Sequence, residues 1–433
     1  MPSDTPAEQQ PAHADEDLDV LAADDAAEEI PDDDDNDMAM DSGDDDDAAA
    51  EELTLANDAI AYFDEPQDSL FAIAQHPLHP SLVAVGGSAG AADDAPGAGW
   101  VFDTSAAPVA LTPLGEAQEV EEVNWLAACP SPDHPNTVAL GANDGSVWVY
   151  AVDPADAANP LQIVQSYFLH TASCTAGTWT PDGRLLATVS EDGTLHVWDV
   201  WGAAAARGLG DSNGQTAVSM TPADQRFEVE GGLYSVAVDP KATFVAVGGA
   251  GGAIKIVSLP RLGTTTSQGK KAGADLTAGG QILASLHTQS DGVETLAVTL
   301  AQTTPATVLL AAGSVDGSIC VYDATRRFAV RRHIVGAHEE HSVVKVEFVR
   351  DSWALTSCGM DGVVRRWDLR GGAAAGGPGA VQASGAADGG LVKEWRGHRG
   401  DGEGGGVLGF VQGQTGERVV TAGDDGVALV FEA

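Results

Sequence analysis

Two histidine clusters in this chain have the residue types of a metal site but not its spacing. His338-Glu339-Glu340-His341 superficially resembles the helix of a zinc hydrolase, but that chemistry needs histidines at i and i+4 with a Glu after the first. Here the histidines stand at i and i+3, in a predicted loop before a strand. His76-Pro77-Leu78-His79-Pro80 lies between two predicted strands and is better explained as a rigid turn than as a pair of ligands. We therefore expect no bound metal.

One glycine-rich segment resembles a phosphate-binding loop. The segment Gly263 to Lys271 has five residues between Gly263 and Gly269, where that loop takes four. It also has no Ser or Thr after Lys270 and no predicted helix behind it. No Ser-His-Asp or Cys-His pairing stands out at the level of motifs. These observations favour a protein that is not an enzyme and needs no cofactor.

A repeated pattern accounts for far more of the chain than these motifs. Each copy has a Ser or Gly, an Asp-Gly pair, an alternating apolar run and then an aromatic residue, often followed by Asp. The clearest copies lie at 190–199, 314–323 and 361–368. Because Asp-Gly favours a tight turn and the flanking apolar residues alternate with period two, each copy predicts two strands joined by a hairpin. The pattern is typical of WD repeats, which bury one another's faces when arranged radially.

Seven such units predict an all-β, seven-bladed WD40 β-propeller over residues 53–433. The fourth unit has Gly251-Gly252 in place of Asp-Gly, so we expect its turn to hold by glycine geometry alone. The seventh unit has only three predicted strands, and an open edge must be covered. The apolar run at 60–63 is the candidate for the missing outer strand. We therefore predict a ring closed by pairing this N-terminal strand with the last blade.

Some polar residues of the repeats are expected to be structural. In the third unit His170, Ser190, Asp192 and Trp198 occupy the positions where WD repeats place a hydrogen-bonded chain. Buried polar groups need such partners, or each costs ~1–3 kcal/mol. In the sixth unit we expect His338 or His341 to take the histidine position, with Gly359 in place of the Ser. The other residues predicted to brace hairpins or strands are Asp144, Asp316, Asp361, Trp367 and Asp425.

Acidic residues recur where the chain leads into the innermost strand of a blade, and two more precede a structural Asp in a hairpin. In a WD propeller these loops and hairpins open on one face, around the central channel. Carboxylates around one mouth would focus a negative potential and attract a cationic peptide, although they could also be ordinary solvated surface acids. The nine candidate partner-binding residues are Asp68, Glu122, Glu191, Glu230, Asp291, Glu294, Glu340, Glu403 and Asp424.

The charge of the chain is strongly asymmetric. The formal net charge is −44, and 38 of the 65 acids precede the first basic residue, Arg184. Residues 1–52 contain 22 acids and no base, so we predict a disordered acidic tail that either keeps the protein soluble or recruits a basic partner. Nucleic-acid binding needs a cationic footprint, so we expect cationic partners and no direct contact with nucleic acid.

The four cysteines, Cys129, Cys174, Cys320 and Cys358, are scattered without close pairing. Each falls in or beside a predicted apolar strand, which indicates buried thiols in a reducing compartment. The N-terminus lacks the features of a secretory signal, and no apolar run approaches the length that spans a bilayer. We expect a monomer in the cytoplasm, the nucleus or both, with no membrane association.

Two stretches resemble a known family. Residues 61–64 with 68–77, and residues 226–236, are similar to the angio-associated migratory cell protein and its fungal relative, a WD-repeat ribosome-assembly chaperone. The resemblance covers about residues 55–433 and includes the acidic leader. It implies a dedicated chaperone that binds the basic N-terminal segment of large-subunit ribosomal protein L10 (uL16) on the acidic face of the propeller and supports assembly of the 60S subunit.

Under that resemblance, the nine acids would be the contacts. Two alternatives remain open from the sequence: a WD40 scaffold in signalling or ubiquitin-ligase assembly, and an escort of another basic protein such as a histone.

Overall fold

The computed structural model describes residues 56–66, 68–76, 79–88, 97–105, 112–120, 123–153, 161–211, 213–263, 276–370, 390–399 and 405–433. All of them belong to one compact unit, residues 54–433. The predicted acidic tail, the resemblance to a phosphate loop after Gly263, and the candidate residues Glu122 and Glu403 lie outside the described residues.

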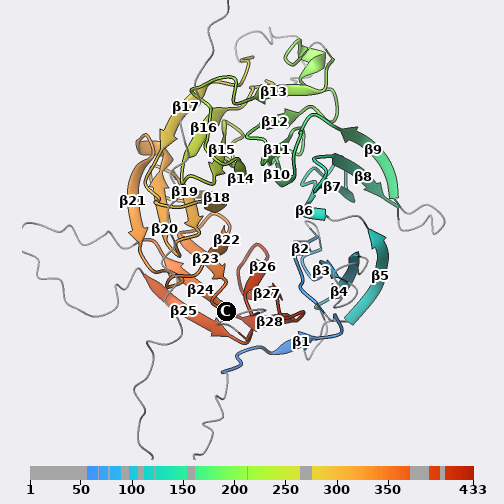
Figure 1. Cartoon of the computed structure of the whole chain (residues 1–433), viewed down its shortest axis with the longest axis vertical. Helices are drawn as coiled ribbons and strands as arrows, with labels where there is room; N and C mark the ends of the chain where they lie inside the picture. Colours follow the sequence, from blue (N-terminus) through green and yellow to red (C-terminus); the bar gives the residue numbers. More distant parts are fainter. Residues whose placement is uncertain are drawn as a thin grey trace, which may run out of the picture. The chain divides into compact units, whose positions relative to one another are not determined.

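The described unit is a ring of seven four-stranded antiparallel sheets, which confirms the predicted seven-bladed propeller (Figure 1). Blades 1 to 3 are β2 (Ala72–Gln75) to β5 (Thr112–Val120), β6 (Val123–Ala128) to β9 (Leu161–Tyr167), and β10 (Cys174–Trp179) to β13 (Thr216–Met220). Their middle strands are β3 (Leu82–Ser88), β4 (Gly97–Asp103), β7 (Thr137–Ala142), β8 (Val147–Val152), β11 (Leu186–Ser190) and β12 (Leu195–Trp198).

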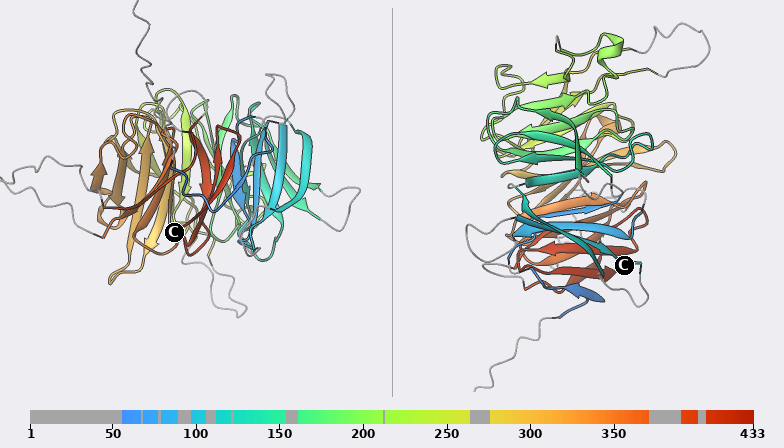
Figure 2. Two further views of the ribbon diagram at one scale, coloured as in Figure 1. Left: turned by 90° about the horizontal axis from the view of Figure 1, so that it is seen from below. Right: turned by 90° about the vertical axis from the view of Figure 1, so that its right-hand side faces the viewer.

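Blades 4 to 6 follow the same order from the channel outward. They are β14 (Leu233–Val238) to β17 (Ile282–Leu286), β18 (Val293–Ala301) to β21 (Ala329–Ile334), and β22 (Val343–Phe348) to β25 (Leu391–Arg396). Their middle strands are β15 (Phe244–Gly249), β16 (Ile254–Ser258), β19 (Thr307–Ser314), β20 (Ile319–Asp323), β23 (Ala354–Gly359) and β24 (Val363–Asp368). Figure 2 shows the blades from the side, with their strands running between the two faces of the ring.

The seventh blade is built from both ends of the described chain. Its inner strands are β26 (Val407–Val411), β27 (Arg418–Gly423) and β28 (Ala428–Glu432), and its outer strand is β1 (Ala61–Phe63). β1 pairs antiparallel with β28, with Ala61 opposite Val430 and Phe63 opposite Ala428. The predicted closure by the N-terminal strand is therefore confirmed.

Glycine holds the hairpins between the second and third strands. In blade 3, Gly193 has φ +76° and donates its amide to the Ser190 carbonyl at 3.0 Å. In blade 4, Gly252 has φ +76° and its amide lies 3.2 Å from the Gly249 carbonyl, so the same turn forms without an Asp. A positive φ is accessible to glycine at little cost, which explains how the fourth unit keeps its turn.

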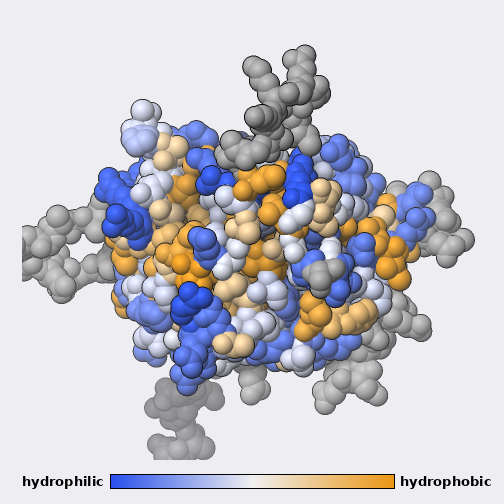
Figure 3. All heavy atoms as spheres, turned by 90° about the horizontal axis from the view of Figure 1, so that it is seen from above, coloured by the Kyte–Doolittle hydropathy of each residue, from blue (hydrophilic) through white to orange (hydrophobic). Residues whose placement is uncertain are grey.

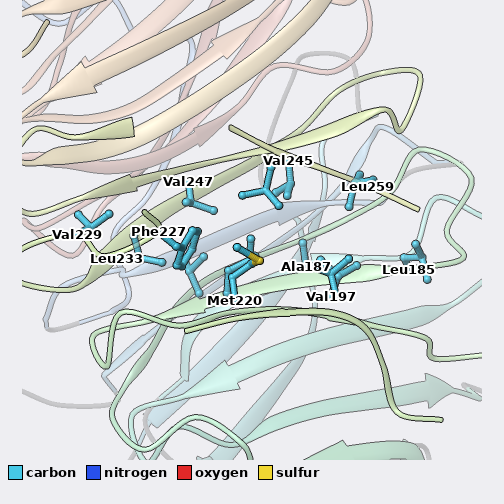
Figure 4. Packing of buried hydrophobic residues seen from close by; sticks show 14 of the residues in the cluster. Leu185, Ala187, Val197, Met220, Phe227, Val229, Leu233, Val245, Val247 and Leu259 are labelled. Carbon is cyan, nitrogen blue, oxygen red and sulfur yellow. The ribbon is translucent and has the colours of Figure 1, made fainter. Parts of the chain in front are cut away.

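Apolar side chains are buried mainly between neighbouring blades. The largest cluster joins blades 3 and 4 and includes Leu185, Val197, Phe227 and Val247 (Figure 4). The strand β14 illustrates how a blade buries apolar side chains on its faces. Its residues alternate between buried and half-buried, because successive side chains point to opposite faces of the sheet. At the rim of the ring, hydrophobic side chains lie among hydrophilic ones (Figure 3). The four cysteines are free and buried.

The helices of the described residues are short 3₁₀ turns, η1 (Ala205–Arg207) and η2 (Ala324–Arg326). In this described part of the chain, no helix combines the length and the apolar character that crossing a bilayer would require.

Candidate functional site

The polar network of blade 3 differs from the prediction at one residue. Trp198 Nε1 donates to Thr188 Oγ1 at 2.8 Å, and the Thr188 hydroxyl lies 2.8 Å from His170 Nε2. His170 Nδ1 lies 2.7 Å from Thr194 Oγ1, which in turn bonds to Asp192. Thr188 is therefore the link to the tryptophan, and the prediction that Ser190 takes this place is wrong.

Ser190 has a different role, within the hairpin of the same blade. Its hydroxyl donates to the Ala172 carbonyl at 3.0 Å and accepts the amide of Asp192 at 3.1 Å. It thus joins the hairpin to the loop before the innermost strand. Thr188 and Ser190 lie on the same face of β11 because side chains alternate along a strand, so only the actual register decides which one meets the histidine.

Blade 6 contains the full network with a serine in the equivalent position. Trp367 Nε1 donates to Ser357 Oγ at 2.9 Å, and that hydroxyl lies 2.7 Å from His338 Nε2. His338 Nδ1 lies 2.9 Å from Asp361 Oδ1. The histidine of this network is thus His338, and the hydroxyl comes from Ser357, two residues before the expected Gly359.

The predicted hairpin aspartates share one arrangement. In each, an Oδ1 accepts the amide two residues further along, at 2.8 Å for Asp144 with Ser146 and 2.9 Å for Asp316 with Ser318. Asp192, Asp361 and Asp425 bond in the same way to Thr194, Val363 and Val427. Asp425 is also bonded to His398 at 3.0 Å. These carboxylates brace turns, which leaves the remaining acids as candidates for binding.

The hairpins and the loops into the innermost strands form one face of the propeller, here called the hairpin face. Within a blade the two segments bond to each other, as when the Glu191 amide donates to the Ser173 carbonyl at 3.1 Å. A hairpin also packs on the loop of the next blade: a Cβ added to Gly252 would lie 3.0 Å from the Asp291 carbonyl oxygen. Loops and hairpins therefore alternate around the channel.

Seven of the nine candidate acids are described, and the topology places all seven on the hairpin face. They are called the acidic ring: Asp68, Glu191, Glu230, Asp291, Glu294, Glu340 and Asp424. Five of them, all except Asp68 and Asp424, are exposed, and those two are partly buried. None of the seven forms an ion pair with a Lys or Arg of the described residues. Their charges therefore add at one mouth of the channel.

Ser69 brings two acidic-ring carboxylates together where the propeller closes. Its amide donates to Asp68 Oδ1 at 2.7 Å, and its hydroxyl donates to Asp424 Oδ1 at 2.5 Å. Ser69 itself is buried, so these bonds hold the loop of blade 1 against the hairpin of blade 7. Two carboxylates far apart in sequence thus stand side by side.

A second group surrounds Tyr234 at the boundary of blades 3, 4 and 5. Burial raises the pKa of Tyr234, and the charges of Glu191 and then Glu294 raise it further. Burial also raises the pKa of Glu294, with a further contribution from the charge of Asp291. Glu294 is open to the channel, yet the channel wall surrounds it and limits its hydration. Two carboxylates, those of Glu191 and Glu294, therefore act on Tyr234, and the charge of Asp291 acts on Glu294.

A repeated β-bulge explains why Glu294 faces the channel. In blades 2 to 7 the pairing of the innermost strand shifts after its first residue, so the second residue is unpaired. Such a bulge redirects a side chain. The six bulge residues all line a central cavity of about 280 Å³, together with Phe71 of blade 1: Asn124, Thr175, Tyr234, Glu294, Val344 and Leu408.

The bulge set contains five residues that sequence reasoning missed. Each is the second residue of an innermost strand, at the position of Glu294, but the alternation of side chains along the sequence does not reveal the bulge that turns it toward the channel. Lys345 also lines the cavity, but its Nζ donates to the Phe410 carbonyl at 2.6 Å and lies 3.6 Å from Glu347. The described lining of this cavity therefore mixes polar and apolar side chains, and Glu294 is the one carboxylate among them.

Fold and site together define a WD-repeat propeller with an acidic mouth. A family model described as "WD domain, G-beta repeat" matches residues 161–199. The crystal structure of Sqt1 from Chaetomium thermophilum is 55% identical with a TM-score of 0.73, and the match covers 88% of this chain and 100% of that one. The chain belongs to the Sqt1 family of WD-repeat proteins.

Two further comparisons concern what family members do. A structure of Chaetomium thermophilum Sqt1 bound to the N-terminus of the ribosomal protein L10 is 53% identical with a TM-score of 0.72, and the match covers 87% of this chain and all of that one. The ribosome assembly protein SQT1 of Saccharomyces cerevisiae is 26% identical over 88% of either chain. None of these names describes a catalysed reaction.

The predicted family resemblance is thereby confirmed. Human angio-associated migratory cell protein is 23% identical, and the match spans 59% of its length. The chain spans 55% of the length of an uncharacterised WD-repeat relative from Schizosaccharomyces pombe.

Proposed function

We propose that this protein is a chaperone that works by binding, without catalysis, and holds the basic N-terminal segment of ribosomal protein L10 on its hairpin face during assembly of the large ribosomal subunit. The acidic ring is the observation that carries this proposal. It presents seven carboxylates on one face, and no Lys or Arg of the described residues is paired with them. A segment rich in Lys and Arg is the chemical complement of such a surface.

The relatives support the choice of partner. The Chaetomium thermophilum protein, more than half identical to this chain over its whole length, has been crystallised with the N-terminus of L10. The Saccharomyces cerevisiae relative is a ribosome assembly protein. For this chain we place the segment across the channel mouth, between Asp68 with Asp424 on one side and Glu191 with Glu294 on the other.

Affinity on such a surface comes from several weak contacts. An exposed ion pair contributes only ~0–1 kcal/mol to the binding free energy, so no single exposed carboxylate of the acidic ring dominates the affinity. Glu294 is different because the channel wall limits its hydration, and a charge interaction is screened less there. We expect Glu294 to be the strongest single contact and the whole interaction to weaken as salt rises.

The test is a titration of a synthetic peptide of the L10 N-terminus against the full chain. Glu191→Lys, Glu230→Lys and Glu294→Lys combined should weaken binding by at least about 30-fold, on the order of 2 kcal/mol. Glu417→Lys is the matched control, because Glu417 is exposed in the turn between β26 and β27, on the opposite face. The control should leave the affinity within about twofold.

Equal affinity of the triple variant and the wild type would refute the proposed site. A histone-tail peptide of the same net charge serves as the competitor. Tighter binding of that peptide would instead favour an escort of another basic protein. We also propose a location in the cytoplasm, the nucleus or both, and the buried free cysteines support a reducing compartment.

A further inference from the structure

A second cavity lies between blades 3 and 4, away from the acidic ring. It has a volume of about 370 Å³. Its walls are the turn between β10 and β11, the turn between β14 and β15, and the segment that follows β16. In an antiparallel blade these turns lie at the opposite end from the hairpin between the second and third strands. The cavity, here called the lower pocket, is therefore on the face opposite the hairpin face.

The lower pocket is cationic in a strongly acidic protein. Arg184, Lys241 and Arg261 line it, and Asp182 is the one carboxylate among the lining residues that the structure describes. Asp182 accepts the Thr180 hydroxyl at 2.7 Å and lies 3.6 Å from Arg184 Nε. The side chains of Lys241 and Arg261 have no ion-pair partner among the described residues. Two exposed cations are thus available to a ligand, and the net charge of the lining is positive.

The base of the lower pocket is apolar. Leu185, Pro260 and Leu262 are buried residues of its lining, and both leucines belong to the core between blades 3 and 4. In Figure 4, Leu185 and Leu259 lie at one end of that core, and Val229 lies at the other. Val229 precedes Glu230 of the acidic ring, which agrees with the placement of the two sites on opposite faces.

The lining distinguishes between classes of anion. Single-stranded nucleic-acid bases are commonly held by stacking on aromatic rings, and none of the eleven described lining residues is aromatic. A nucleic-acid backbone needs a long cationic track, whereas here three cations surround one cavity. An apolar base with a cationic rim suits an aliphatic side chain flanked by carboxylates.

We propose that the lower pocket binds an acidic peptide segment, with an aliphatic side chain on Leu185 and Leu262 and its carboxylates on Lys241 and Arg261. The partner is a protein carrying Asp or Glu on both sides of a Leu or similar residue. Because the two sites open on opposite faces, this protein can hold a basic segment and an acidic partner at the same time. The chaperone would then act as an adaptor that links its basic client to a second, acidic protein.

The test uses a fluorescein-labelled hexapeptide of sequence DELDEL with the full chain. Polarisation should report binding that weakens by about tenfold in the double variant Lys241→Glu, Arg261→Glu, equivalent to 1.4 kcal/mol. Binding should also weaken with salt, and a DEGDEG peptide should bind more weakly because it lacks the aliphatic side chain. Arg350→Glu is the matched control: it reverses an exposed arginine in the corresponding turn of blade 6 and should change the affinity by less than about twofold.

Several results would overturn this inference. They are no measurable binding of DELDEL, equal binding by the double variant, and tighter binding of a single-stranded RNA hexamer than of DELDEL. The L10 peptide separates this inference from the proposed function. The double variant should bind that peptide normally, and the triple acidic-ring variant should still bind DELDEL.

Discussion

Phe63 of β1 lies directly opposite Ala428 of β28, so the ring is closed by a strand from near the start of the described chain. Phe63 is buried and its ring centroid lies 4.5 Å from that of Phe102 in blade 1. Its neighbour Tyr62, on the same strand, points outward and is 66% exposed. One three-residue strand therefore joins blade 7 to blade 1 through a single aromatic side chain.

We expect Phe63→Ala to destabilise the propeller by ~3 kcal/mol, because it removes a large side chain from between two blades. Urea unfolding followed by tryptophan fluorescence measures this loss. Tyr62→Ala is the matched control and should cost less than ~0.5 kcal/mol, as expected for an exposed residue. If both variants lower the free energy of unfolding by the same amount, closure of the propeller does not depend on the buried phenyl ring of Phe63.

Thr188→Val should destabilise blade 3 more than Ser190→Ala does. The first change removes the hydroxyl between Trp198 and His170 and leaves two buried groups without a partner, at ~1–3 kcal/mol each. Ser190→Ala removes only the bonds of a hairpin, for ~1 kcal/mol. Thr188→Ser should keep most of the wild-type stability, because a serine, Ser357, takes the equivalent position in blade 6. The same urea measurement ranks the three variants. The reverse order would argue that the Ser190 hydroxyl, and not that of Thr188, is the link between Trp198 and His170.

The sequence was sufficient for the architecture because each blade repeats the same turn and the same alternation. Even blade 4, with Gly251-Gly252 for Asp-Gly, was predictable, because a tight turn needs glycine more than it needs aspartate. The choice between Ser190 and Thr188 was not predictable. Both lie on one face of β11, and only the rotation of the histidine loop against that strand decides which hydroxyl is reached.

At the candidate site, too, the sequence alone does not determine which side chains face the channel. Glu294 was predicted from its charge, whereas Tyr234 and Asn124 were missed although they occupy the equivalent position. The cause is the bulge at the start of each innermost strand, which inverts the expected direction of one side chain. A rule based on simple alternation cannot anticipate it.

Stability should fall as pH falls below about 6.5, because two histidines of blade 3 are buried in their neutral form. Burial lowers the pKa of His170 to about 4, with a contribution from His196, and burial lowers that of His196 to about 4 as well. Unfolded histidines take up protons near pH 6.5. Between pH 6.5 and pH 4 the unfolded state binds more protons than the folded state does. The stabilising contribution of the two neutral histidines is therefore fully present above pH 6.5 and is lost as the pH falls toward 4. For each histidine the loss is on the order of 3 kcal/mol.

Urea unfolding between pH 7.5 and 4.5 measures that dependence. His196→Gln should flatten the slope by about one proton, because glutamine does not titrate. Ser219, whose hydroxyl lies 3.0 Å from His196 Nδ1, offers the control: Ser219→Ala should lower stability slightly and leave the slope unchanged. An unchanged slope in the His196 variant would show that other groups control the acid sensitivity.

Glu294 should lower stability while it strengthens binding. Burial in the channel, and then the charge of Asp291, raise its pKa above the ordinary ~4.3 of a glutamate. A carboxyl group with a raised pKa contributes its full stability below about pH 4.3, and that contribution is lost as pH rises through the raised value. Glu294→Gln should therefore raise the urea midpoint at pH 7 but not at pH 4.

The same variant should weaken binding of the L10 peptide by about fivefold (~1 kcal/mol), because the removed charge lies where screening is least. Glu417→Gln, on the opposite face, should change neither property. The ionised carboxylate of Glu294 destabilises the free protein because the channel hydrates it poorly. Binding of a cationic segment would offset this loss of stability, which is a common trade-off at binding sites. A Glu294→Gln protein that is less stable at pH 7, or that binds the peptide as well as the wild type does, would contradict this account.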